Sequence, residues 1–182
     1  MMDPPTKPIT FEEFMAMEVP HGQKWELVNG QIYKQEVLPL GRGGWPHECA
    51  KSRVIQELIL WREQVGTGIV LFESMYVIAE GFTPIPDVSY LSVEPPATEG
   101  WLESAPDLAV EVAYSERVVD LDEKVRLYLA HGVRSVWILY PKTRTIVVFR
   151  PNGVASLSGD DSLREPEILP GFEASVRSFF ED

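Results

Sequence analysis

Glu111 is the residue whose setting most strongly suggests chemistry. The segment Asp107–Ala113 has the alternating pattern of a β-strand, with its branched apolar residues on one face. Glu111 shares the other face with two alanines, whose small side chains leave space above it. Because a charged carboxylate in a partly buried strand is costly unless it is paired or bound to a metal, this position indicates a site.

Asp87 supplies a second carboxylate at the start of another predicted strand. It follows Pro86 directly and precedes the apolar run Val88–Leu91. A proline-aspartate pair is also common in turns, so a turn aspartate is the alternative interpretation.

Lys124 is the candidate amine, and it comes from a predicted helix. At helical spacing, Leu121, Val125 and Tyr128 form an apolar stripe, and Lys124 flanks it. Its stem can lie along that stripe and bring the ammonium toward the preceding strand. The alternative is a lysine that extends to solvent.

Together these residues have a common chemical logic. Two converging carboxylates, from Asp87 and Glu111, can bind a hard divalent ion such as Mg²⁺ or Mn²⁺. The ion lowers the pKa of a bound water and stabilises charge on a phosphate. An ammonium from Lys124 can orient that water or neutralise the transition state.

The composition limits how nucleic acid could be bound. The formal net charge is −12 and the pI is about 4.7, which excludes a broad basic surface. Any nucleic acid must therefore be held by a local basic patch and by metal ions. A single cysteine, Cys49, allows no internal disulfide, and no Cys/His cluster indicates zinc.

The length of 182 residues fits one domain spanning residues 1–182. The N-terminus has no hydrophobic segment of the secretory type, and no apolar run reaches the ~18 residues that a membrane span needs. We therefore expect a cytoplasmic protein.

The hydrophobic pattern predicts an α/β or α+β fold with a mixed sheet. We expect a capping box at Thr10 before a short helix, and a hairpin over Trp25–Val37 that turns at Asn29-Gly30. A Gly-rich loop, Leu38–Gly44, should then precede a long helix. The remaining predicted elements are the helices 46–65 and 119–131 and the strands 69–73, 75–79, 85–91, 107–113, 133–140 and 145–150. An apolar tail cluster (Phe172, Val176, Phe179 and Phe180) should pack back onto the domain.

The order of several motifs resembles the Uma-two family of restriction-endonuclease-like proteins, within the PD-(D/E)XK nuclease superfamily. The resemblance covers nearly the whole chain. It is carried by Lys24–Gly30, Pro86–Leu91, Pro106–Val112, Asp120, Lys124, Tyr128, Gly132-Val133, Val136–Leu139 and Leu169–Phe172.

The resemblance implies a restriction-endonuclease-like core of mixed sheet and flanking helices, often as a homodimer. It implies Mg²⁺-dependent hydrolysis of phosphodiesters, with Asp87 and Glu111 as metal ligands. The superfamily's usual lysine falls at Ala113, and Lys124 on the following helix takes its place. Glu26 matches an early glutamate that supports the metal or its water, with an outward charge on the hairpin as the alternative. His47 either approaches the scissile phosphate or is simply polar at a helix start.

Three functions remain open at this stage. The first is a metal-dependent endonuclease, whose DNA contacts would come from Arg42, Lys51, Arg53 and Arg117. The second is a non-catalytic oligomerisation or protein-interaction module that retains the nuclease fold. The third is hydrolysis of another phosphoester, such as a nucleotide or RNA, and the acidic surface makes a small substrate easier to accept.

Overall fold

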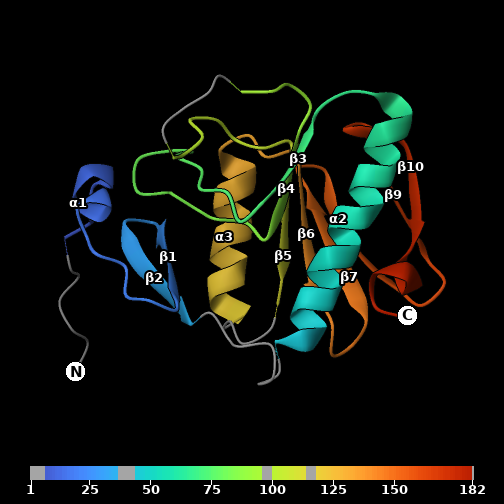
Figure 1. Cartoon of the computed structure of the whole chain (residues 1–182), viewed down its shortest axis with the longest axis horizontal. Coiled ribbons are helices and arrows are strands. Elements are labelled where there is room, and N and C mark those ends of the chain that lie inside the picture. Colours follow the sequence, from blue (N-terminus) through green and yellow to red (C-terminus); the bar gives the residue numbers. More distant parts are fainter. Residues whose placement is uncertain (1–6, 37–43, 96–99, 114–117, 182) are drawn as a thin grey trace.

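A six-stranded mixed sheet forms the centre of the computed structural model (Figure 1), with strand order β3-β4-β5-β6-β7-β8. The structure describes residues 7–36, 44–95, 100–113 and 118–181. The helices are α1 (Phe11–Met15), α2 (Trp45–Val65), α3 (Val118–Ala130) and the short 3₁₀ helix η2 (Val176–Phe179). The strands are β1 (Gln23–Val28), β2 (Gln31–Glu36), β3 (Ile69–Phe72), β4 (Val88–Leu91), β5 (Leu108–Val112), β6 (Ser135–Tyr140), β7 (Thr145–Arg150), β8 (Gly153–Ser158), β9 (Ser162–Glu165) and β10 (Leu169–Ser175).

Strands β5 and β6 are parallel, and α3 connects them across one face of the sheet. The other neighbouring pairs in this sheet are antiparallel. This confirms the mixed sheet flanked by helices that the sequence predicts. The crossover brings α3 over β5, the strand that carries Glu111.

The two faces of the sheet are covered by different elements (Figure 1). Helix α2 covers one face, here called the α2 face, and packs Ala50, Val54, Leu58 and Trp61 against it, as the helical spacing predicts. Val65, at the end of the same stripe, is exposed. The even residues of β5 belong to this layer. The opposite layer contains Ala109 and the α3 residues Leu121, Val125, Leu127 and Tyr128. The alternation along β5 therefore turns Glu111 toward α3.

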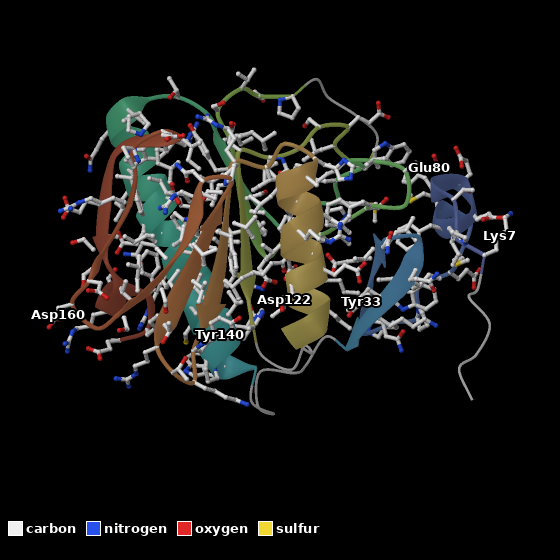
Figure 2. All side chains as sticks on the ribbon, turned by 180° about the vertical axis from the view of Figure 1, so that it is seen from behind. Lys7, Tyr33, Glu80, Asp122, Tyr140 and Asp160 are labelled. Atoms are coloured by element: carbon white, nitrogen blue, oxygen red, sulfur yellow. The ribbon has the colours of Figure 1, made fainter. Side chains whose placement is uncertain are left out.

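The hairpin β1–β2 lies beside α3 on this second face (Figures 1 and 2). It turns at Asn29 and Gly30, which have φ angles of 53° and 71°, as a tight turn requires. A bridge between Leu27 and Thr83 ties the hairpin to the rest of the fold. Thr10 forms the predicted capping box with Glu13 before α1.

The C-terminal segment covers the α2 face, and its strands were not predicted. Strands β9 and β10 form a separate two-stranded sheet, and β8 extends the central one. The predicted packing of the tail is confirmed, because Phe172, Val176 and Phe179 are buried against α2 and the sheet. In Figure 2 the labelled Asp160, after β8, lies at the opposite side of the molecule from Lys7.

Two strand predictions between β3 and β5 are wrong. Met75–Ala79 forms isolated bridges to Leu102 and Phe82 rather than a ladder, and β4 begins at Val88 rather than at Ile85. Pro84 and Pro86 have no N–H to donate, so a regular ladder cannot run through them. The predicted loop Leu38–Gly44 lies outside the described residues except for Gly44.

Across the part of the chain that the structure describes, no helix is both long enough and apolar enough to span a membrane.

Candidate active site

Asp87 and Glu111 are brought together by the pairing of β4 and β5. The antiparallel register places Val88 opposite Val110. One step further along, Asp87 stands opposite Glu111, and residues that face each other across such a pair project to the same side. Both carboxylates are nearly inaccessible, with exposed fractions of 6% and 2%. Asp87 is therefore more than a turn residue, because it lies opposite Glu111, the carboxylate with which it was predicted to converge.

Asp87 is held by the Val112 N–H, the His47 imidazole and, as an ion-pair partner, the Lys24 ammonium. Its Oδ2 accepts the Val112 N–H of β5 at 2.8 Å and lies 3.3 Å from His47 Nε2 in the first turn of α2. Its Oδ1 lies 3.7 Å from the Lys24 ammonium of β1. Burial alone would raise the pKa of Asp87, but the bond to His47 and the charge of Lys24 bring it well below its ordinary value. Asp87 is consequently ionised.

Glu111 has its partners on α3, as the geometry of the crossover requires. Its Oε1 lies 2.7 Å from Lys124 Nζ and accepts a hydrogen bond from Tyr128 Oη at 2.9 Å. Lys124 and Tyr128 are four residues apart and so share one face of the helix. Burial, and then the negative charge of Glu111, raise the pKa of Tyr128 well above its ordinary value. The phenol therefore stays protonated and donates.

Lys124 is buried rather than extended to solvent, because its side chain is only 1% exposed. Its Nζ also reaches both oxygens of Glu26, at 3.1 and 3.0 Å. Glu26 itself is fully buried, so the alternative of an outward charge on the hairpin is wrong. Its Oε1 accepts the Ile85 N–H at 2.6 Å. This bond explains why Ile85 does not join β4.

Lys24 and His47 complete the cluster from the other side. Burial lowers the pKa of Lys24, but the carboxylates of Glu26, Asp87 and Glu111 outweigh it, and the net shift is upward. Burial also lowers the pKa of His47, and the bonds to Asp87 and Glu48 reverse this and raise it. Lys24 was not predicted as a site residue. Its position two residues before Glu26, on the same face of β1, is the signal that could have found it.

The site is a compact cluster in which negatively charged side chains contact positively charged ones. Three carboxylates (Glu26, Asp87 and Glu111) face two ammonium groups and one imidazole. Burial makes an uncompensated charge very costly, so the fold itself needs these partners. The charged side chains come from β1, α2, β5 and α3 and from the residue just before β4.

The donor set fits a magnesium-type ion better than a zinc ion. Among the described residues, no three His, Cys, Asp or Glu side chains form a group that could hold a metal. Mg²⁺ needs only one or two carboxylates, because waters and substrate phosphates complete its shell. Asp87 and Glu111 are hard oxygen donors on one face of neighbouring strands, so they satisfy that requirement.

The structure gives less support to the basic residues that were predicted to contact nucleic acid. Lys51 Nζ is bound to Glu48 and Glu73, both at 2.8 Å, so its charge is already neutralised. Arg53 lies on α2 but has interactions of its own. Arg42 and Arg117 lie outside the described residues.

Tyr128→Phe should lower the free energy of unfolding by about 1–3 kcal/mol, because Glu111 would lose a buried donor. Denaturant unfolding measures this. Tyr33→Phe is a matched control, since Tyr33 Oη is buried and has no hydrogen-bond partner among the described residues. Removing this hydroxyl breaks no hydrogen bond, so Tyr33→Phe should not destabilise the protein. Equal effects of the two substitutions would contradict the assignment.

The sheet order, the α3 crossover and the carboxylate pair on β4 and β5 together define a restriction-endonuclease-like fold. The chain belongs to the Uma2 family, described as "putative restriction endonuclease", whose model matches residues 11–177. This confirms the resemblance that the sequence motifs indicate.

A solved structure supports the same fold. It is a crystal structure at 1.96 Å of a putative nuclease belonging to DUF820 from Anabaena variabilis ATCC 29413. The match has a TM-score of 0.78 at 20% identity, covering 95% of this chain and 98% of that chain. At this identity the likeness shows the shared fold. No match was found among curated proteins.

Proposed function

We propose that this protein is a metal-dependent nuclease that hydrolyses phosphodiesters of nucleic acid, with DNA as the substrate to test first. The observation that carries the proposal is the placement of Asp87 and Glu111 on one face of neighbouring strands. Membership of the Uma2 family, described as "putative restriction endonuclease", supports it.

Asp87 and Glu111 would hold Mg²⁺ or Mn²⁺. The ion, when bound, would acidify a water and stabilise charge on the phosphate. Hydrolysis of a phosphodiester adds a water across a P–O bond: the water oxygen bonds to phosphorus, the bond to the sugar oxygen breaks, and the sugar oxygen takes up a proton. The chain's own residues must therefore hold the carboxylates ionised and in place.

Lys124 provides a fixed positive charge beside Glu111, at 2.7 Å. A charge held in a water-poor site stabilises a developing negative charge without having to reorganise. Glu26 binds Lys124 through both of its oxygens, so it acts as a positioning residue. Tyr128 orients Glu111 from the same helix face.

The net charge of −12 implies that DNA is held weakly and that the affinity falls steeply with salt. On the family resemblance alone, we propose that the protein works as a homodimer. Two copies of the site would then face the two strands of a duplex.

The test combines calorimetry with cleavage. We expect Mn²⁺ and Mg²⁺ to bind the wild type, and Asp87→Ala and Glu111→Ala to abolish that binding. Cleavage of plasmid and single-stranded substrates should fall at least about a hundredfold, because the ion contributes several kcal/mol to the transition state.

The control is Asp160→Ala, which removes an exposed carboxylate on the far side of the molecule (Figure 2). It should leave metal binding and cleavage unchanged. If the wild type binds no divalent ion even with nucleic acid present, the catalytic proposal is wrong. The retained fold would then point to a non-catalytic interaction module.

A further inference from the structure

The two lysines of the candidate site are held very differently. Lys124 has three acceptors within 3.1 Å, two on Glu26 and one on Glu111. An ammonium has three N–H donors, so these contacts occupy all of them. Lys124 therefore cannot contact a substrate without breaking a buried ion pair, which is strongly unfavourable.

Lys24 is held more loosely. Its ammonium lies 3.7 Å from Asp87 Oδ1, which is an ion pair beyond hydrogen-bond distance. Its side chain is 16% exposed, against 1% for Lys124. Of the two, only Lys24 is free to move without losing hydrogen bonds that the described part of the chain supplies.

His47, the other side chain that binds Asp87, is fixed at both ends of its ring. Nε2 lies 3.3 Å from Asp87 and Nδ1 lies 3.1 Å from Glu48 on the same helix. A ring held on both nitrogens cannot turn away from Asp87 without losing two partners. Lys24 is therefore the more easily displaced of these two partners of Asp87.

Lys24 lies at the edge of a hollow of about 350 Å³, which its side chain could enter. Besides Lys24, the hollow is lined mostly by apolar side chains, among them Phe14, Trp25 and Ile85, and by one carboxylate, Glu73. Ile85 donates its N–H to Glu26, so the hollow adjoins the site carboxylates. An extended lysine side chain can keep its apolar stem against such a lining while its ammonium reaches an anion.

The charges favour a displacement of this kind. Asp87 is already compensated by Lys24 and His47. A divalent cation on Asp87 would bring two further positive charges next to that ammonium, and like charges at such distances repel strongly. The cation and Lys24 therefore compete for one carboxylate.

We propose that Lys24 is the substrate-facing amine of this site: it neutralises Asp87 in the metal-free protein, and cation binding releases it to contact the phosphate of the substrate. The inference rests on the proposed function. It assigns to Lys24 the contact that Lys124 cannot make, and it makes Lys24 a determinant of metal affinity.

The test is Lys24→Met, followed by two readouts that should move in opposite directions. Calorimetry without nucleic acid should show about tenfold tighter Mn²⁺ binding, because the competing charge is gone. Cleavage of plasmid DNA at saturating Mn²⁺ should fall about a hundredfold, because the phosphate loses a charged partner. A merely structural role for Lys24 would weaken both properties together.

Lys34→Met is the matched control on the same hairpin. Lys34 is exposed and packs its ammonium over Trp25, 4.3 Å from the ring centroid. Its replacement should change neither metal affinity nor cleavage.

A measurement on the wild type covers the case in which Lys24→Met fails to fold. Added Mg²⁺ should increase acetylation of Lys24 by a small amine-reactive reagent, followed by mass spectrometry, and leave Lys34 unchanged. Unaltered or reduced modification of Lys24, or unaltered Mn²⁺ affinity in Lys24→Met, overturns the inference. Failure of the proposed function would look different, because the wild type itself would then bind no cation.

Discussion

Lys124→Met is expected to lower the free energy of unfolding by about 3–5 kcal/mol, the usual cost of removing one partner from a buried ion pair. Methionine keeps the apolar stem but leaves Glu26 and Glu111 without the ammonium that both carboxylates contact. For a domain of this size the melting temperature should fall by roughly 6–20 °C.

Two further variants isolate the electrostatic cause. Adding Glu26→Gln to Lys124→Met removes one uncompensated charge, so it should recover about 0.5–3 kcal/mol of the loss. Arg126→Met is the control on the same helix: its side chain is 65% exposed and pairs only loosely with Glu123, at 3.7 Å. It should cost less than about 1 kcal/mol. If Lys124→Met is no worse than Arg126→Met, the charges are not buried together.

Glu165→Leu should also lower the free energy of unfolding by about 3–5 kcal/mol, because it removes a buried charged group from its partners on the other face of the sheet. Glu165 is 2% exposed and accepts hydrogen bonds from Ser135 Oγ at 2.6 Å and Trp137 Nε1 at 2.9 Å. It also pairs with Arg150 at 2.9 Å. Leucine would leave the serine and indole donors buried without an acceptor.

Glu165 lies outside the candidate site, whereas Lys124 lies within it, so comparing the two variants separates effects on stability from effects on function. Below its own melting temperature, Glu165→Leu should bind Mn²⁺ and cleave DNA like the wild type, because Glu165 belongs to the α2 side of the sheet. Thermal unfolding and calorimetry on the same samples measure both properties. Loss of metal binding in folded Glu165→Leu would mean that the two faces are coupled through the sheet.

The parts of the fold that depend on local pattern could be predicted. The helical spacing over Ala50, Val54, Leu58 and Trp61 and the alternation around Glu111 both hold, because burial imposes these periods directly. Strands β8, β9 and β10 were not predicted. No residue of β8 is fully buried, one of the two buried residues of β9 is the charged Glu165, and β10 contains Pro170, Gly171 and a shift in register, so none of the three shows a clear hydrophobic alternation.

The candidate site could be predicted in part. The convergence of Asp87, Glu111 and Lys124 follows from the strand and helix faces, and the structure brings these residues together. Lys24 was missed although it shares a face of β1 with Glu26, because its ion-pair partner Asp87 is far from it in sequence. The wrong start of β4 has the same origin: the Ile85 N–H is bound by Glu26 rather than by a neighbouring strand.

The bond between Lys124 and Glu26 joins residues that are 98 positions apart. During synthesis, at about 5–20 residues per second, β1 would therefore leave the ribosome roughly 5–20 s before its ion-pair partner exists. Throughout that interval Glu26 must stay hydrated, since burying it alone is too costly. The hairpin β1–β2 can thus dock in its final place only after α3 has been made, so a nascent chain that ends before Lys124 has no assembled site.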